Sequence, residues 1–240
     1  HSACQCALEL SFALQYSYTL YHNCASITIH LSGILCVDMD RAKYLAQAEL
    51  LSDQVSRTEL SVILRELQRT LEQGTTGDVV EFGCYVGTTS VHLAKFLQPT
   101  SKQLWLYDSF EGLPEKTHED RSPAGEQFVA GELHATKKQL LRNLTRAGVP
   151  MPRITKGWFS DITAEQVPGE IAFAFLDGDY YRSVLDPLKL IWPKLTPGAT
   201  IIVDDYANEA LPGASRAVDE WLRSHDGKLR VEHSLGIIHT

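Results

Sequence analysis

Short apolar runs alternate with amphipathic stretches from residue 79 onward, and this alternation constrains the fold more than any other feature of the sequence. Short apolar runs between helical segments are typical of strands buried in a parallel sheet. The pattern therefore predicts β-α-β units with right-handed crossovers, a mainly parallel sheet and helices on both of its faces. The expected strand and helix pairs are residues 79–82 and 88–97, 104–107 and 136–147, 171–176 and 183–195, and 200–203 and 214–224.

Two further apolar segments end the chain, at residues 229–232 and 235–239. Only His233 and Ser234 separate them. A connection this short joins antiparallel strands, because parallel neighbours need a long crossover. We therefore expect an antiparallel pair at the edge of the sheet.

A helix is predicted before the first strand. Ser56 and Glu59 match a capping box, and Gly74 is a suitable helix terminator. The residues between them place one apolar face on the helix: Leu60, Ile63, Leu64, Leu67 and Leu71. The sequence thus predicts an α/β fold with a helical N-terminal extension.

Residues 1–38 contain no Lys or Arg and differ in composition from the rest of the chain. Polar residues interrupt every apolar run there, whereas a membrane span needs about 20 consecutive apolar residues, and the basic start of a secretory signal is missing. We expect the natural protein to begin near Met39, with residues 1–38 as upstream sequence or an extension without a catalytic role. The predicted division is residues 1–38, a helical, lid-supporting segment at 39–75, and a ligand-binding domain at 76–240.

Charge and cysteine content limit the partners and the compartment. The net charge of −8 argues against nucleic acid, which selects basic surfaces. Four of the five cysteines precede Met39, and only Cys84 follows, so disulfides do not support the main domain. We predict a reduced, cytoplasmic protein that binds a small molecule and neither nucleic acid nor membrane. The sequence leaves the oligomeric state open and is compatible with a homo-oligomer.

Acidic residues follow four of the predicted strands. Ligands of open α/β sheets bind beyond the carboxyl ends of the strands, so these residues are the first candidates for a site. They are Glu81 at the end of the first strand, Asp108 after the second, Asp177 and Asp179 after 171–176, and Asp204 and Asp205 after 200–203.

The first strand runs into a glycine turn that opens a helix. Gly83 permits a tight turn and Gly87 a close approach of ligand, although the spacing is neither that of a dehydrogenase nor that of a P-loop. A purely structural turn explains the same spacing. Asp108 strengthens the ligand-binding interpretation, because a carboxylate there accepts both hydroxyls of a ribose. The alternative role for Asp108 is to cap a helix or a turn.

Several motifs together resemble class I S-adenosylmethionine-dependent methyltransferases of the macrocin O-methyltransferase family. They are the run 78–89, LYDSFEGLP at 106–114, KGWFSD at 156–161, LDGDY at 176–180 and IVDDY at 202–206. The resemblance extends from about Met39 to the C-terminus. It implies a Rossmann-like, seven-stranded sheet, magnesium dependence and methylation of sugar hydroxyls on antibiotics.

The resemblance also implies the cofactor site. The residues around the methionine part are expected to be Glu81, Gly83, Tyr85, Gly87 and Thr88, with Asp177 nearby. Asp108 and Ser109 are expected at the ribose. Trp158, Phe159 and Asp161 are expected at the adenine.

Methyl transfer to a sugar hydroxyl needs a more acidic hydroxyl than the free sugar offers, and a divalent cation supplies that acidity. In this fold the strands that end at Asp177 and at Asp204-Asp205 are neighbours, so these three carboxylates are predicted to bind Mg²⁺. A capping role for Asp204-Asp205 is the alternative. Asp179 is the candidate general base, with His118 and His134 as alternatives.

The polar segment 110–129 is predicted to be a lid, with a solvated loop as the alternative. We expect an S-adenosylmethionine- and magnesium-dependent O-methyltransferase acting on a sugar or a glycosylated small molecule. The alternatives are a catechol-type O-methyltransferase and a catalytically silent protein that binds an adenosine ligand. The acceptor and the methylated position are not determined by the sequence.

Overall fold

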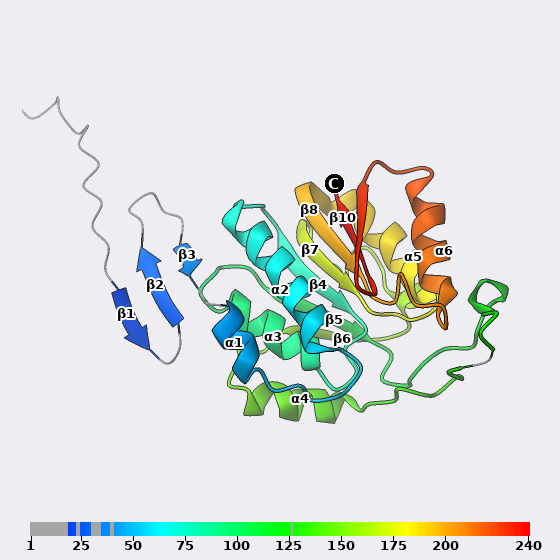
Figure 1. Ribbon diagram of the computed structural model, residues 1–240, viewed down its shortest axis with the longest axis horizontal. Helices are drawn as coiled ribbons and strands as arrows, with labels where there is room; N and C mark the ends of the chain where they lie inside the picture. Colours follow the sequence, from blue (N-terminus) through cyan, green and yellow to red (C-terminus); the bar gives the residue numbers. More distant parts are fainter. Residues whose placement is uncertain (1–18, 23–24, 30–34, 39–40, 126) are drawn as a thin grey trace, which may run out of the picture. The chain divides into compact units, whose positions relative to one another are not determined.

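The computed structural model describes residues 19–22, 25–29, 35–38 and 41–240, except residue 126 (Figure 1). The chain divides into two compact units, residues 1–40 and 41–240. In the first unit, β1 (Thr19–His22), β2 (Ala25–Ile29) and β3 (Leu35–Asp38) form an antiparallel sheet in that order. The sequence pattern did not predict these strands. The expected start of the natural protein, Met39, lies outside the described residues.

The second unit is built on a seven-stranded sheet of order β6-β5-β4-β7-β8-β10-β9. The parallel strands are β4 (Asp78–Phe82), β5 (Leu104–Asp108), β6 (Arg153–Lys156), β7 (Ile171–Leu176) and β8 (Leu195–Val203). The antiparallel edge pair is β9 (Lys228–Glu232) and β10 (Leu235–His239). The predicted mainly parallel sheet with an antiparallel edge is confirmed.

Helices cover both faces of this sheet, as predicted (Figure 1). On one face lie α2 (Arg57–Glu72), α3 (Thr88–Leu97) and α4 (Lys137–Arg146), and α1 (Arg41–Gln47) packs on α2. On the other lie α5 (Tyr181–Ile191) and α6 (Pro212–Leu222). Single 3₁₀ turns occur at η1 (His118–Asp120), η2 (Phe159–Asp161) and η3 (Trp192–Lys194). Among the described helices, none has the length and apolarity to cross a membrane.

The apolar pattern missed strand β6. Its four residues, Arg-Ile-Thr-Lys, contain no apolar run, and the strand lies at the edge of the sheet with both of its ends exposed. An edge strand has only one neighbour and needs little apolar surface. The omission matters because the chain passes from β6 directly into the Trp158-Phe159 segment.

The strand order places a crevice beside β4. This strand lies between β5 and β7, and all six residues of β7 are buried. The chain leaves β4 for α3 on one face and leaves β7 for α5 on the other, so the two connections diverge at the carboxyl ends of the strands. Such a switch point is where open α/β sheets bind ligands.

An ion-pair network fixes α2 to the antiparallel edge of the sheet. Glu66 of α2 is 1% exposed, and its Oε1 lies 2.8 Å from Nη2 of both Arg65 and Arg230. Arg65 also binds both carboxylate oxygens of Glu232 at 2.8 and 2.7 Å. Because Arg230 and Glu232 belong to β9, the network joins α2 to the last strands of the sheet.

We expect Glu66→Ala to lower the free energy of unfolding by about 2 kcal/mol, since the substitution removes the buried carboxylate that Arg65 and Arg230 share. The arginines retain access to water, which limits the loss. Glu72→Ala, at the exposed end of the same helix, is the matched control and should change stability by less than about 0.5 kcal/mol. Urea unfolding measures both. Equal effects of the two substitutions would contradict the structural role of the network.

Candidate functional site

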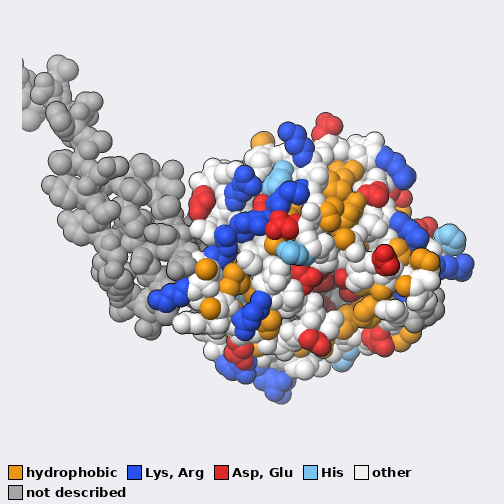
Figure 2. All heavy atoms as spheres, in the orientation of Figure 1, with side chains coloured by type: hydrophobic (Ala, Val, Ile, Leu, Met, Phe, Trp, Pro, Cys, Tyr) orange, Lys and Arg blue, Asp and Glu red, His pale blue; other side chains and the backbone are white. Residues whose placement is uncertain are grey.

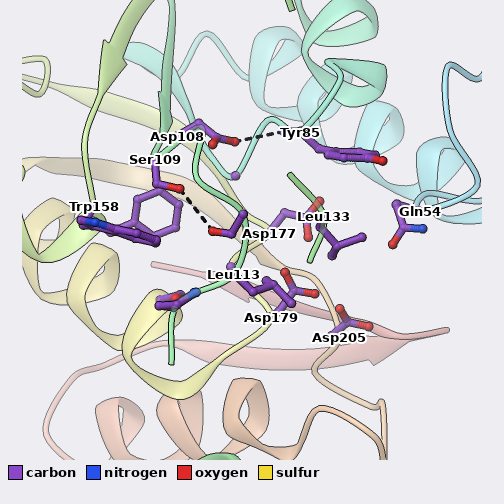
Figure 3. Close-up of a pocket in the computed structure, with 16 residues that line it drawn as sticks. Gln54, Tyr85, Asp108, Ser109, Leu113, Leu133, Trp158, Asp177, Asp179 and Asp205 are labelled. Carbon is purple, nitrogen blue, oxygen red and sulfur yellow. Dashed lines mark hydrogen bonds between the residues drawn. The ribbon is translucent and has the colours of Figure 1, made fainter. Parts of the chain in front are cut away.

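A pocket opens at the carboxyl ends of β4, β5, β6, β7 and β8 (Figure 3). Nine of the residues predicted for the site line it: Gly83, Tyr85, Asp108, Ser109, Trp158, Phe159, Asp177, Asp179 and Asp205. On the face drawn in Figure 2, acidic side chains gather in a recess near the middle of the unit. The structure therefore brings together groups from the carboxyl ends of five strands, β4 to β8.

The glycine turn after β4 is forced by a close backbone approach. Gly83 has φ +91°, and a Cβ atom built on it would lie 1.8 Å from the carbonyl oxygen of Asp177. Gly87 also has a positive φ, and as the N-cap of α3 it directs the first N–H groups of that helix toward the turn. At position 83, only glycine combines a positive φ with so close an approach to the carbonyl oxygen of Asp177.

Asp108 holds the glycine turn in place. Its Oδ2 accepts hydrogen bonds from the backbone N–H of Cys84 at 2.8 Å and of Tyr85 at 3.0 Å, and its Oδ1 accepts from Phe110 N at 2.7 Å. These contacts match the turn-capping alternative for Asp108. A carboxylate offers about four acceptor positions, so part of its capacity still faces the pocket. The ribose role stays a prediction beside the structural one.

Aromatic side chains form the wall on the β6 side. Trp158 is 37% exposed and lines the pocket, and Phe159 packs edge-on against Phe82 at 5.4 Å between ring centroids. Figure 3 shows Trp158 on one side of the pocket and Asp205 on the opposite side. Asp161 is exposed and is not among the lining residues. Its predicted contact with the adenine stays untested.

Three carboxylates gather on the other side of the pocket. One oxygen each from Asp177, Asp179 and Asp205 lies within 4.8 Å of the other two. Desolvation raises the pKa of each of these carboxyls, and repulsion from neighbouring acids adds to the rise at Asp177 and Asp179. Asp179 and Asp205 have positive φ values of 61° and 56°, so the backbone is strained to bring them together.

This cluster fits a hard cation. Its ligand atoms within the described part of the chain are all carboxylate oxygens, which magnesium prefers. Positive charge would relieve the repulsion that raises the pKa values of these acids.

Asp204 does not belong to this group. It is 6% exposed, and its Oδ1 accepts a hydrogen bond from Asp205 N at 2.8 Å. Ser234 Oγ lies 3.3 Å from the same oxygen and 2.5 Å from Glu59 Oε1, which connects Asp204 to the start of α2. Burial raises the pKa of Asp204 to about 8. Asp179 therefore occupies the place in the cluster that the sequence assigned to Asp204, whose predicted role as a metal ligand stays untested.

The other predicted residues do not line the pocket. Glu81 and Thr88 are buried, and Thr88 Oγ1 lies 3.1 Å from Ser52 Oγ. Gly87 is absent from the lining as well. The alternative bases, His118 and His134, are exposed and do not line the pocket.

Some lining residues were not predicted. Gly112, Leu113 and Pro114 belong to the LYDSFEGLP motif, which was a usable signal. Gln54 and Leu133 carried no signal, since each comes from a loop far away in the sequence.

Comparison with known proteins places these features in a family context. A family model described as macrocin-O-methyltransferase (TylF) matches residues 46–233. An 8-demethyl-8-(2,3-dimethoxy-alpha-L-rhamnosyl)-tetracenomycin-C 4'-O-methyltransferase from Streptomyces olivaceus is 34% identical over 152 residues, covering 60% of this chain and 58% of the relative. The mycinamicin III 3''-O-methyltransferase of Micromonospora griseorubida is 31% identical over 170 residues, covering 66% and 65%. The chain thus spans less than two thirds of the length of these relatives.

Solved structures agree on the fold. The O-methyltransferase NovP superposes with a TM-score of 0.68 at 24% identity, covering 77% of this chain and 80% of NovP. The calicheamicin methyltransferase CalS11 gives 0.64 at 19% identity, covering 83% and 89%. Structures bound to S-adenosylhomocysteine, the demethylated cofactor, also share the fold, including an O-methyltransferase from Bacillus cereus with a TM-score of 0.52 at 16% identity.

The buried carboxyl of Glu81 predicts a pH dependence of stability. Burial raises its pKa to about 8, so the folded protein keeps a proton that the unfolded chain releases above its ordinary pKa near 4.5. The contribution of Glu81 to stability is therefore lost as pH rises from about 4.5 to 8. We expect Glu81→Gln to reduce this loss by about 2 kcal/mol or more between pH 5 and pH 8.

Urea unfolding in EDTA at pH 5, 6.5 and 8 compares the wild type with Glu81→Gln. The aspartate cluster contributes with the same sign in both proteins. Because the charge of Glu81 also raises the pKa of Asp177, the difference between the two curves measures Glu81 together with its coupling to Asp177. If the unfolding free energies of the two proteins changed in parallel with pH, the result would contradict the raised pKa of Glu81.

Proposed function

Because the chain belongs to the macrocin O-methyltransferase family, we propose that it transfers a methyl group from S-adenosylmethionine to a hydroxyl of a sugar or of a glycosylated small molecule. The relative from Streptomyces olivaceus is named for a rhamnosyl tetracenomycin, and the CalS11 structure for a calicheamicin methyltransferase. These names support a glycosylated acceptor. Since the chain spans only part of these relatives, both the activity and the acceptor are proposals.

One observation carries the proposal: a single pocket combines an aromatic wall with a carboxylate cluster (Figure 3). Trp158 provides a flat apolar surface for a base, whereas Asp177, Asp179 and Asp205 provide groups that handle a proton and a cation. A protein that only binds an adenosine ligand needs the aromatic wall but not the carboxylate cluster. The presence of both halves in one pocket favours an enzyme.

The cofactor is proposed to lie between the glycine turn and the aromatic wall. Trp158 and Phe159 would contact the adenine, with Asp161 close to its amine, and Asp108 and Ser109 would bind the ribose hydroxyls. The methionine part would lie along the turn formed by Gly83, Tyr85, Gly87 and Thr88, above the buried carboxyl of Glu81 and beside Asp177. Asp177 would thus contact both halves of the pocket, which places the methyl group next to the carboxylate cluster.

Mg²⁺ is proposed to be held by Asp177 and Asp205 with either Asp204 or Asp179 as the third carboxylate. When bound, it would supply the Lewis acidity that lowers the pKa of an acceptor hydroxyl. The cluster of Asp177, Asp179 and Asp205 supports Asp179, whereas the sequence motif supports Asp204. In its outer position, Asp204 would orient Asp205 through the backbone N–H of that residue.

In the arrangement with Asp204 as the third ligand, Asp179 is not bound to the cation, and we propose that it accepts the hydroxyl proton. It lies beside Asp177 and Asp205, and its pKa is raised, which brings its proton affinity closer to that of a base working near neutral pH. Positive charge at the neighbouring carboxylates would favour its ionised, proton-accepting form. Leu113 and Leu133 would enclose the acceptor on the side open to solvent.

The substrate class is tested with methyl-labelled S-adenosylmethionine and Mg²⁺. The acceptors are mycinamicin III and demethyldecarbamoylnovobiocin, for which two relatives are named, and further glycosides that bear free sugar hydroxyls. We expect the label on a sugar hydroxyl, located by tandem mass spectrometry, and no transfer to the matched aglycones. Catechol and caffeate serve as the comparison. Transfer to a catechol ring rather than to any sugar would overturn the acceptor class, and binding of S-adenosylhomocysteine without transfer to any acceptor would favour a binding protein.

The roles of two carboxylates are separated by Asp177→Asn and Asp179→Asn, assayed with the acceptor found above. We expect Asp177→Asn to regain activity at high Mg²⁺, since an amide oxygen is a weaker ligand for the same cation. Asp179→Asn cannot accept a proton, so its turnover should fall by roughly 10² to 10⁴ at every Mg²⁺ concentration. Initial rates against Mg²⁺ concentration measure both, with thermal melting as the control for folding. Rescue of Asp179→Asn by Mg²⁺ would make Asp179 a ligand instead of the base.

A further inference from the structure

The connection between β5 and α4 makes a long detour that returns to its starting point. Leu113 N donates to Glu132 O at 2.8 Å, and Gly131 N donates to Leu113 O at 2.9 Å, so the two ends of the detour are bonded to each other. We call residues 113–132 the excursion. Leu113 and Pro114, at its start, line the pocket. The polar segment predicted to be a lid thus begins as part of the pocket wall.

One acidic residue of the excursion is buried and belongs to no part of the proposed chemistry. Asp120 is 2% exposed. Its Oδ2 accepts hydrogen bonds from Thr117 N at 2.7 Å and from Thr117 Oγ1 at 2.8 Å. Its Oδ1 accepts from the backbone N–H of Tyr181 at 2.6 Å. One carboxylate therefore joins the excursion to the first residue of α5.

Helix α5 has no side-chain cap of its own. Its N-cap is Tyr180, whose side chain cannot accept the N–H groups of the first turn, so Asp120 supplies an acceptor from a distant part of the sequence. Asp179 lies two residues before Tyr181 and has the strained φ of 61°. A bond that fixes Tyr181 N also fixes the turn that carries Asp179, because only one residue separates them.

The start of α6 packs against the carboxylate of Asp120. A Cβ on Gly213 would lie 2.0 Å from Asp120 Oδ1 and 2.6 Å from Tyr181 N, so the residue at this position has to be glycine. Arg216 of α6 donates to the backbone carbonyls of Glu119 and Arg121 on either side of Asp120. A solvated loop, the alternative interpretation of this segment, does not need a buried carboxylate that is enclosed by two helices.

We propose that Asp120 is a positioning residue. Through its bond to Tyr181 N it holds Asp179 in the carboxylate cluster. Through its bonds to Thr117 it holds the start of the excursion, which includes the pocket residues Leu113 and Pro114, close to the same turn. The inference rests on the proposed function for the role of Asp179. As a consequence, the Asp120 side chain sets the position of both the excursion, which begins in the pocket wall, and the turn that carries the proposed base, Asp179. Loss of the Asp120 carboxylate therefore loosens both segments.

The deciding experiment is hydrogen–deuterium exchange on Asp120→Ala, with Glu115→Ala, an exposed residue of the same excursion, as the matched control. We expect exchange in peptides covering residues 176–184 to accelerate about tenfold or more in Asp120→Ala, since local opening depends on the bonds removed. Thr117→Val removes only the hydroxyl contact and should accelerate exchange in the excursion alone. Unchanged exchange at 176–184 in a folded Asp120→Ala protein would overturn the proposal.

A second readout tests the carboxylate cluster itself. Mn²⁺, followed by electron paramagnetic resonance, serves as the probe, and Asp120→Ala should bind it about tenfold more weakly or worse, as outer-shell substitutions do. S-adenosylhomocysteine affinity should stay within about twofold, because Asp120 makes no contact with the cofactor side of the pocket. Wild-type affinity for Mn²⁺ in Asp120→Ala would overturn the proposal. Failure of the wild type to bind Mn²⁺ would refute the magnesium site alone, and exchange at 176–184 would still decide on Asp120.

A backbone variant covers the case in which Asp120→Ala does not fold. Tyr181→Pro removes the N–H that Asp120 binds, at the first helical position, where proline is well tolerated, and after the extended Tyr180. Tyr181→Ala loses the same side chain but keeps the N–H. We expect faster exchange at 176–184 in Tyr181→Pro than in Tyr181→Ala, and equal exchange in the two would count against Asp120 as a positioning residue.

Discussion

Mutual repulsion among the acids at the ends of β7 and β8 is the constraint around which the rest of the site is arranged. Asp177, Asp179 and Asp205 place carboxylate oxygens within 4.8 Å of one another, and Asp204 is buried directly behind them. Each group is also desolvated, so protons are held at all four positions more tightly than in water. A fold keeps such an arrangement only when other interactions over-determine it. Here those interactions come from the backbone of neighbouring strands and from distant loops.

The glycine-turn side of the pocket is mechanically continuous with this cluster. Gly83 contacts the carbonyl of Asp177, and Asp108 holds the glycine turn by its backbone N–H groups. A shift of β4 relative to β7 would therefore move both halves together. This coupling suits the proposed in-line methyl transfer, in which donor and acceptor have to be aligned closely.

Segments far apart in the sequence complete the site. Glu59 at the start of α2 reaches Asp204 through Ser234, and Glu66 of the same helix is bound by Arg230 of β9. Gln54 enters the pocket from the loop before α2, and Asp120 reaches the start of α5 from the excursion. Helix α2 and the excursion thus support the ends of the strands that form the site.

The sequence by itself determined the α/β class, the antiparallel edge pair, the α2 capping box and nine of the residues that line the pocket, because these depend on local periodicity and on motifs at strand ends. It could not reveal β6, whose short exposed segment has no apolar pattern, or the roles of Asp120 and Gln54, whose partners lie in other loops. Only the tertiary structure placed Asp179 within the cluster and Asp204 behind it. Neighbouring residues in a sequence share a motif, but the direction of each carboxylate depends on backbone turns such as those at Asp179 and Asp205, and packing between elements decides those turns.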